Sequence, residues 1–207
     1  VRVAVGLRLG AKLCEPHVCP CGAKVDPEGT HGLACRRSSG RPTRHHVLND
    51  MIWRSLVAAG VPSIKEPAGL LRSDGKRPDG LTQIPWQSGK CMTWDVTVTD
   101  TLAESYLSTT SVNAGAAAEG AASRKKSKYQ ALATTHSFIP IAFETLGPIN
   151  AKGLSFFREL GRRLSARSGE PRETQFLFQR FSIAIQRFNS ICFHGSFLEE
   201  AISDHDT

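Results

Sequence analysis

The sequence lacks the long apolar runs and the leader segment that mark membrane and secreted proteins. No run of about 18 apolar residues occurs in its 207 residues, so no membrane-spanning helix is expected. The N-terminus has no charged start followed by an apolar stretch and a small-residue cleavage site, so secretion is not expected. The chain begins with Val1 instead of Met, which indicates a segment cut from a longer product.

Internal repeats and low-complexity tracts are also missing, apart from an alanine-rich stretch. Hydrophobic residues make up 40% and charged residues 22% of the chain, close to the globular average, which argues against a disordered or fibrous protein. The length suits one sizeable domain, or a domain of about 150 residues with a small satellite. It is too short for a polymerase.

Positive charge exceeds negative charge, mainly in the first sixty residues. The chain carries 26 Lys and Arg against 19 Asp and Glu, a net charge of +7. Residues 1–60 hold nine basic and four acidic residues, whereas residues 61–100 carry no net charge. Such a local excess suits a polyanion, most often a nucleic acid, although a basic surface that only aids solubility is an alternative.

Cysteine is concentrated near the N-terminus, where four of the six cysteines lie within residues 14–35 beside histidines. Without a secretion signal, a metal site explains this cluster better than disulfides do, and the metal would supply folding energy to the irregular residues 1–43. Reduced, buried thiols are the alternative.

The spacing within this cluster favours a tetrahedral zinc site. Its second half has the three-residue spacing of zinc knuckles, but its first half has one residue between the cysteines instead of about two or three. Cys14 or His17 could replace one of the first two ligands. The favoured ligand set is Cys19, Cys21, His31 and Cys35.

Hydrophobic periodicity predicts an α/β fold with a mixed sheet. A helix is expected over residues 43–59, with Thr43 as its N-cap and Gly60 as its end. The elements expected after it are strands over 63–71, 81–85 and 91–99, an alanine-rich helix over 113–133, a strand over 138–145 and two C-terminal helices. The predicted parts of the chain are a zinc-knuckle-like module with a basic linker (1–43), an α/β core (44–150) and a helical extension (151–207).

Two aspartates in the predicted sheet indicate a site for a divalent metal. Asp79 follows Pro78 in a turn, and Asp95 lies inside the otherwise apolar strand over 92–98. A carboxylate in such a strand is costly unless it meets a cation or hydrogen-bond donors. Carboxylates at adjacent strands can hold Mg²⁺ or Mn²⁺, which activates water for attack on a phosphate. Alternatively, Asp79 is only a turn residue and Asp95 faces solvent.

The alanine-rich helix carries two lysines near its end. Lys125 and Lys128 follow small alanines on the face expected to pack on the sheet, so a lysine could neutralise a phosphate or orient a water. Alternatively, they form a basic last turn that only complements the helix dipole. Glu144, at the end of the next strand, could close the site or act as a cap.

Taken in order, these motifs resemble a known family. They are the Cys-Cys-His-Cys knuckle, Arg44-His45 at a helix start, Pro78-Asp79, Asp95-x-Thr97 and Lys125-x-x-x-Tyr129. They resemble the restriction-like endonuclease domain of site-specific non-long-terminal-repeat retrotransposons, which belongs to the PD-(D/E)XK nuclease superfamily. The resemblance covers residues 14–147, two thirds of the chain, and leaves the tail from residue 151 unexplained.

The resemblance implies a restriction-endonuclease-like core of helix, three strands, helix and strand. It implies Mg²⁺- or Mn²⁺-dependent nicking of double-stranded target DNA beside a reverse transcriptase domain on the same polypeptide. It also implies Zn²⁺ in the knuckle and an intracellular, nuclear location, and leaves the oligomeric state open. The implied catalytic residues are Asp79 and Asp95 as metal ligands, Glu66 as a further acidic ligand, Lys125 and Tyr129.

The chain departs from the superfamily pattern at Thr97, where a lysine is expected, so Lys125 would have to serve instead. Two other interpretations therefore stand: a catalytically inactive nucleic-acid-binding module that keeps the nuclease fold, and a junction-resolving nuclease. The residues expected to contact nucleic acid are Arg37, Arg41, Arg44, His45, Lys76, Arg77 and Lys128.

Overall fold

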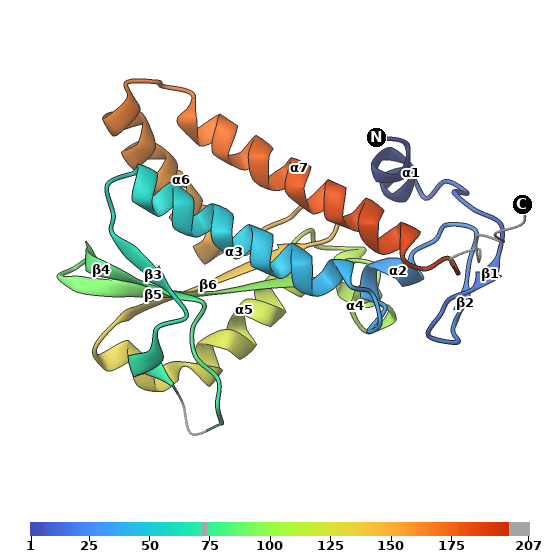
Figure 1. Cartoon of the computed structure of the whole chain (residues 1–207), viewed down its shortest axis with the longest axis horizontal. Coiled ribbons are helices and arrows are strands. Elements are labelled where there is room, and N and C mark those ends of the chain that lie inside the picture. The colour runs from blue at the N-terminus through green and yellow to red at the C-terminus, as the bar shows by residue number, and fades with distance from the viewer. Residues whose placement is uncertain (72–73, 199–207) are drawn as a thin grey trace, which may run out of the picture. The chain divides into compact units, whose positions relative to one another are not determined.

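A computed structural model describes residues 1–71 and 74–198 of the chain (Figure 1). Its contacts define two compact units, one made of residues 1–43 and 186–198, the other of the described residues of Arg44–Ile185. The helices α3 (Gly40–Ala58) and α7 (Glu173–His194) each run from one unit into the other. Among the described residues, no helix combines the length and apolar character needed to cross a membrane.

The larger unit contains a four-stranded mixed sheet in the order β3-β4-β5-β6. Antiparallel pairing joins β3 to β4 and β4 to β5, whereas β5 and β6 are parallel. The parallel pair requires a crossover, which α5 (Ala116–Lys128) provides. The strands are β3 (Ser63–Lys65), β4 (Gly80–Gln87), β5 (Lys90–Thr99) and β6 (Ser137–Glu144). The chain is therefore a mixed α/β protein, with seven α-helices in its described part.

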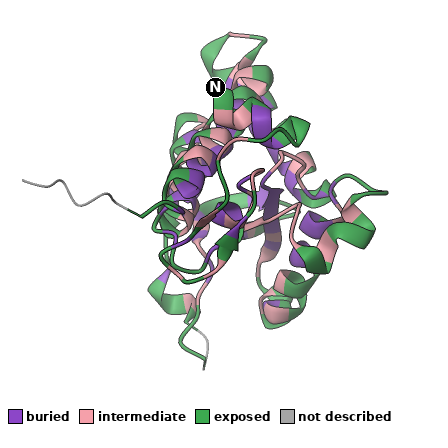
Figure 2. Ribbon diagram, turned by 90° about the vertical axis from the view of Figure 1, so that its right-hand side faces the viewer, coloured by how far each residue is buried: buried purple, intermediate pink, exposed green. Residues whose placement is uncertain are grey.

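Alternation along β5 gives the sheet two different faces. Met92, Trp94 and Val96 belong to the main apolar core with residues of α3, α6 (Ala151–Ser168) and α7, because successive side chains of a strand point to opposite sides. Asp95 lies on the other face, where Lys125 of α5 reaches it. Figure 1 shows α5 on one side of the sheet and the other three helices on the opposite side. Figure 2 shows buried residues along the central strands.

Small side chains bring α5 close to the sheet. Ala118, Ala121 and Ala122 pack with Ala142 of β6 in a buried cluster. The first turn of α5 is held by Glu144, which is fully buried and whose Oε1 accepts hydrogen bonds from the backbone N–H groups of residues 117 and 118 at 3.0 and 3.1 Å. A carboxylate suits the free N–H groups and positive dipole of a helix start. Glu144 is thus a helix cap.

The smaller unit is built from short elements. Leu7, Leu33 and Cys192 form its small apolar cluster. Gly32 permits a close backbone approach there, because a Cβ atom at this position would lie 2.6 Å from the carbonyl oxygen of Cys192. The elements before α3 are α1 (Arg2–Leu9), β1 (His17–Val18), β2 (Lys24–Val25) and α2 (His31–Ala34).

Several predicted boundaries were wrong. Strand β3 ends at Lys65 instead of residue 71, because Glu66 takes a positive φ of 49° and a 3₁₀ turn, Ala68–Leu70, follows. Helix α3 begins three residues before Thr43, which lies inside the helix and donates to the Ser39 carbonyl. The alanine-rich helix is shorter than predicted, beginning after Gly115 at φ 90° and ending at Lys128. The helices α1 and α4 (Glu104–Thr110) were not predicted.

The contact between Gly80 and Trp94 gives a test of the core. A Cβ atom on Gly80 would lie 2.0 Å from Cζ2 of the fully buried Trp94 indole. We expect Gly80→Ala to lower the free energy of unfolding by about 1–3 kcal/mol, because overpacking forces neighbours apart. Urea denaturation measures this as a lower midpoint at unchanged slope.

Gly69→Ala is the matched control, because a Cβ atom there meets nothing within 4 Å. Its effect should stay within about 0.5 kcal/mol. Equal midpoints for the two variants would contradict the packing described for Gly80.

Candidate functional site

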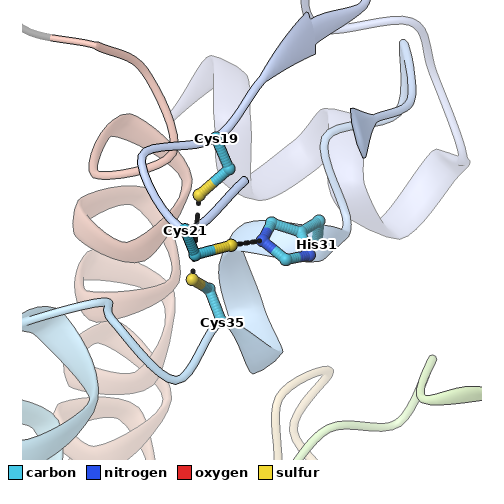
Figure 3. A group of neighbouring side chains, drawn as sticks. All are labelled: Cys19, Cys21, His31 and Cys35. Atoms are coloured by element: carbon cyan, nitrogen blue, oxygen red, sulfur yellow. Dashed lines mark hydrogen bonds between the residues drawn. The ribbon is translucent and has the colours of Figure 1, made fainter. Parts of the chain in front are cut away.

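The first candidate site is a cluster of three cysteines and one histidine in the smaller unit. The ligand atoms of Cys19, Cys21, His31 and Cys35 all lie within 4.8 Å of one another (Figure 3). The sulfur atoms of Cys19 and Cys35 are 3.7 Å apart, and the sulfur of Cys21 lies 3.2 Å from Nε2 of His31. Three sulfurs and an imidazole are ligands that zinc prefers. The group could hold a metal ion such as zinc, and it is the ligand set favoured from the sequence.

Two tight local structures bring these ligands together. Between β1 and β2, the Cys19 N–H donates to the Ala23 carbonyl and the Gly22 N–H donates to the Cys19 carbonyl, with Gly22 at φ 90°. His31 begins α2 and Cys35 follows it, with the Cys35 N–H donating to the His31 carbonyl at 2.9 Å. Residues four apart lie on one side of a helical turn. One turn and one helical turn therefore present two ligands each.

The two thiols of the first turn differ in acidity. Burial raises the pKa of Cys19 to about 11, and hydrogen bonding with the thiols of Cys21 and Cys35 acts in the same direction. A backbone hydrogen bond from Ala23 is the main cause that lowers the pKa of Cys21 to about 6. Metal ligation requires thiolates, so binding would displace a proton from Cys19 at neutral pH.

The two alternative ligands lie outside this cluster. The sulfur of Cys14 is 3.4 Å from the Asp26 carbonyl oxygen. The His17 ring contacts the Ser196 hydroxyl at 3.2 Å and stacks on Phe197 with ring centroids 4.2 Å apart. The structure therefore groups Cys19, Cys21, His31 and Cys35 without Cys14 or His17.

Two of the arginines expected at nucleic acid contact the cluster's own backbone. Arg37 donates to the Pro20 carbonyl, and Arg41 donates to the Ala34 carbonyl, both at 2.9 Å. These bonds link the chain after the ligands to both ligand-bearing turns. They give Arg37 and Arg41 a supporting role at the cluster.

The second candidate site lies on the α5 face of the sheet in the larger unit. The Asp79 N–H donates to the Trp94 carbonyl at 2.9 Å, and Oδ2 of Asp79 accepts the Val96 N–H at 2.6 Å. These bonds flank Asp95 on β5, so the two aspartates are neighbours across the β4–β5 pair. The side chain of Asp79 is 16% exposed and that of Asp95 is 4% exposed.

Lys125 reaches the site from α5, the helix that covers this face of the sheet. Its Nζ lies 2.5 Å from Oδ1 of Asp95. Burial raises the pKa of Asp95, the negative charge of Asp79 raises it further, and Lys125 opposes both effects. The ionised Asp95 carboxylate is therefore destabilised by its surroundings, and positive charge stabilises it.

His45 joins this acidic site from α3. Its Nε2 lies 3.1 Å from Oδ2 of Asp79. This hydrogen bond is the largest cause of a raised pKa for His45, which burial partly offsets. The histidine predicted to contact DNA thus pairs with a predicted metal ligand.

Asn49, one helical turn after His45, was missed in the sequence. Its Nδ2 donates to the Asp79 carbonyl at 3.3 Å, and its Oδ1 accepts the indole N–H of Trp94 at 2.8 Å. It therefore ties the Asp79 backbone to the strand that carries Asp95. The four-residue spacing from His45 was the available signal.

Tyr129 places its hydroxyl at the same site while its ring is buried. The hydroxyl donates to the Arg77 carbonyl at 2.7 Å, receives a hydrogen bond from Lys128 at 3.2 Å and helps to lower the pKa of Asp95. Burial, and then the charge of Lys125, lowers the pKa of Lys128. Thr97 is half-buried and lies two residues after Asp95 on the same face of β5.

Two predicted site residues have other surroundings. Glu66 pairs with the Arg77 guanidinium at a partly exposed position, which argues against Glu66 as a third metal ligand. Arg44 is only 2% exposed, so its guanidinium is not presented to a phosphate. Lys76 is exposed, as a contact to DNA would require. Four of the five predicted catalytic residues lie together; the Glu66 backbone N–H also donates to the Asp79 carbonyl at 2.9 Å, but its exposed side chain pairs with Arg77.

Replacing single cysteines tests the metal cluster. We expect the full chain to purify with one zinc ion, and Cys35→Ser to lose it, because serine oxygen replaces a thiolate that zinc prefers. Cys14→Ser is the matched control and should retain the ion. Elemental analysis of purified protein measures zinc content, and loss of zinc from the Cys14 variant would contradict the ligand set.

The pairing of His45 with Asp79 predicts a pH dependence in metal-free protein. The pKa of His45 is higher in the folded than in the unfolded protein, so its pairing with Asp79 stabilises the fold. This stabilisation is complete at pH values below the unfolded pKa of His45, and it is lost as the pH rises through the folded pKa. Asp79→Asn should lower the titration midpoint of His45 in NMR spectra. An unchanged midpoint would show that Asp79 does not stabilise the protonated form of His45.

Comparison with known proteins does not assign this chain to a family. No protein-family model matches the sequence, and no curated protein matches it.

Proposed function

We propose that this chain is a metal-dependent DNA endonuclease domain of the PD-(D/E)XK type. The observation that carries the proposal is the meeting of Asp79, Asp95 and Lys125 on one face of the mixed sheet. Paired carboxylates with a lysine are the groups that metal-assisted hydrolysis of a phosphodiester needs.

The order of elements supports the same proposal. The larger unit runs from α3 through the antiparallel strands β3, β4 and β5, and then through α5 to the parallel strand β6. This is the order of helix, three strands, helix and strand that the resemblance to retrotransposon endonucleases implies. Fold order alone does not assign an activity, so the site residues carry the argument.

The donor set of the acidic site fits Mg²⁺ or Mn²⁺. Both candidate ligands offer carboxylate oxygens, which hard divalent cations prefer. Asp95 is buried beside Asp79, and this raises its pKa, so a divalent cation would offset the unfavourable negative charge. Asp79 and Asp95 would hold the ion. When bound, such an ion lowers the pKa of a water and stabilises charge on the attacked phosphate.

The protein's own groups prepare the site for a phosphate. Lys125 presents its ammonium beside Asp95, where it can pair with a phosphate oxygen as negative charge develops. It enters from α5 on the face where Thr97 lacks a basic group, which supports Lys125 as the substitute for the expected lysine. His45 orients the Asp79 carboxylate through its Nε2. Tyr129 fixes the Arg77 backbone next to the aspartates.

In this proposal the domain nicks double-stranded target DNA beside a reverse transcriptase domain on the same polypeptide, in the nucleus. The Cys/His cluster would bind zinc and steady the smaller unit, whose exposed basic side chains would contact the DNA. The excess of positive charge in residues 1–60 supports that division of roles.

A second candidate is a nucleic-acid-binding module that has lost catalysis. Thr97 favours it, because the superfamily lysine is absent from its usual strand. The close Lys125–Asp95 pair also fits it, since a permanent ion pair satisfies the buried carboxylate without any metal.

Plasmid nicking separates these two functions. We expect the full chain with Mg²⁺ to nick supercoiled plasmid, and Asp79→Asn and Asp95→Asn to abolish nicking because metal ligands are lost. Lys125→Gln should slow nicking by roughly a hundredfold through loss of charge stabilisation. Gel electrophoresis of the plasmid measures the rate.

Asp50→Asn is the matched control, because Asp50 pairs with Arg54 and Lys65 instead of the acidic site. Its nicking rate should equal that of the parent. Undiminished nicking by Asp79→Asn would sink the endonuclease proposal. DNA binding without nicking under Mg²⁺ or Mn²⁺ would leave the inactive module as the function.

A further inference from the structure

Two adjoining cavities open on the larger unit, beside the turn that joins β4 to β5. One has a volume of about 490 Å³ and lies against α6, and the other has a volume of about 360 Å³ and lies against the end of α5. Gln87, Ser137 and Lys152 line both, so the cavities form one continuous depression. We call it the basic groove, after the basic residues that line it: Lys90, Lys126, His136, Lys152 and Arg163.

Positive charge in the basic groove is largely uncompensated. Glu159 is the one carboxylate among the described residues that line it, and it is already bound by Arg162 and Arg163 at 2.8 and 2.7 Å. The hydrogen bonds from these arginines lower the pKa of Glu159 to about 2, so it stays ionised and paired. Lys126 and Lys152 are exposed and form no ion pair within the described part of the chain.

The remaining lining groups favour a polyanion over an apolar ligand. Lys90 has a fixed position, because its Nζ donates to the carbonyls of Ala133 and Thr134 at 3.1 and 3.0 Å. Gln87 and Ser137 add neutral hydrogen-bonding groups of the kind that contact phosphate oxygens. The aromatic rings at the groove, Trp86, Tyr129, Phe138 and Phe156, are at most 8% exposed and offer no free face for base stacking. The groove therefore has phosphate-binding groups and no exposed aromatic ring for base stacking.

Helix α5 connects the basic groove to the acidic site. Neighbouring helical residues point about 100° apart, so Lys125 turns to Asp95 while Lys126 turns to the groove. Tyr129 belongs to both, because it lines the groove and places its hydroxyl beside Arg77 and Asp95. A phosphate chain that passes the acidic site can continue along the same helix into the groove.

We infer that the basic groove binds the sugar-phosphate backbone of the DNA that the acidic site acts on. This inference rests on the proposed endonuclease function, and it extends the DNA contacts to the far side of α5, beyond the residues expected from the sequence. Recognition by lysines without stacked bases makes the contact independent of DNA sequence.

Removing two groove lysines tests the inference. Binding of the full chain to a labelled DNA duplex is measured across a range of salt without added Mg²⁺, which separates binding from cleavage. Lys126→Gln combined with Lys152→Gln should weaken binding roughly tenfold at low salt and reduce the slope of log K against log salt by ~0.9 for each lysine. The loss should be equal for duplexes of different sequence.

The matched control combines Arg158→Gln with Arg167→Gln, which removes the same charge from exposed positions of α6 in the larger unit, outside both cavities. The control should keep the parent's slope. An equal loss in the control, or parental binding by the groove variant, would overturn the inference. If the parent never nicks DNA but the groove variant still loses binding, the endonuclease proposal fails and the groove stands.

Lysine acylation read by mass spectrometry tests the unmodified chain. The DNA duplex should protect Lys126 and Lys152 from acylation, whereas inorganic phosphate should not. Equal protection by inorganic phosphate would assign the groove to a free anion and overturn the inference, as would full reactivity of both lysines in the DNA complex.

Discussion

The ion pair between Asp95 and Lys125 is the interaction on which the larger unit's site depends. A carboxylate in the middle of a buried strand is tolerated only when a cation or several donors reach it, because an unpaired charge there is strongly destabilising. This requirement explains why α5 must cross the sheet closely and why alanines line its inner face. The neighbouring aspartate, Asp79, is held by His45 at its carboxylate and by Asn49 at its backbone carbonyl. In this part of the molecule, the close packing of α5 on the sheet is therefore what allows Lys125 to neutralise Asp95.

The smaller unit meets a related requirement by other means. Its apolar clusters are small, and one of them consists of Cys19, Val25 and Cys35, so two candidate metal ligands also serve as core residues. A unit of this size gains little from apolar burial alone, and a bound metal would supply the missing folding energy. The cysteine sulfurs lie close together already, which reduces the rearrangement that binding requires.

Site residues that are related by local spacing could be predicted from the sequence. Residues whose surroundings depend on long-range contacts could not. The four candidate zinc ligands lie within seventeen residues, and Asp79, Asp95 and Lys125 could be placed near one another from the predicted strands and helix. The partner of His45 lies 34 residues away, so the sequence placed this histidine at DNA instead of at Asp79. Glu66 was expected at the site from the family resemblance, and the positive φ that ends β3 at this residue leaves no trace in the hydrophobic pattern. Burial of Arg44 was equally invisible, since an arginine near a helix start is usually exposed.

The cap formed by Glu144 fixes where α5 begins, and so fixes which of its residues face the acidic site and which face the basic groove. With the first turn anchored, the angular position of each later residue depends only on how many residues precede it, at about 100° and 1.5 Å per residue. Deleting one residue from the middle of α5 would bring Lys126 to Asp95 and Ser127 to the basic groove. An insertion there would bring Arg124 to Asp95 and Lys125 to the groove. Because Arg124, Lys125 and Lys126 are all basic, a positive charge would face Asp95 after either change. The basic groove would keep a positive charge at this position after the insertion but not after the deletion.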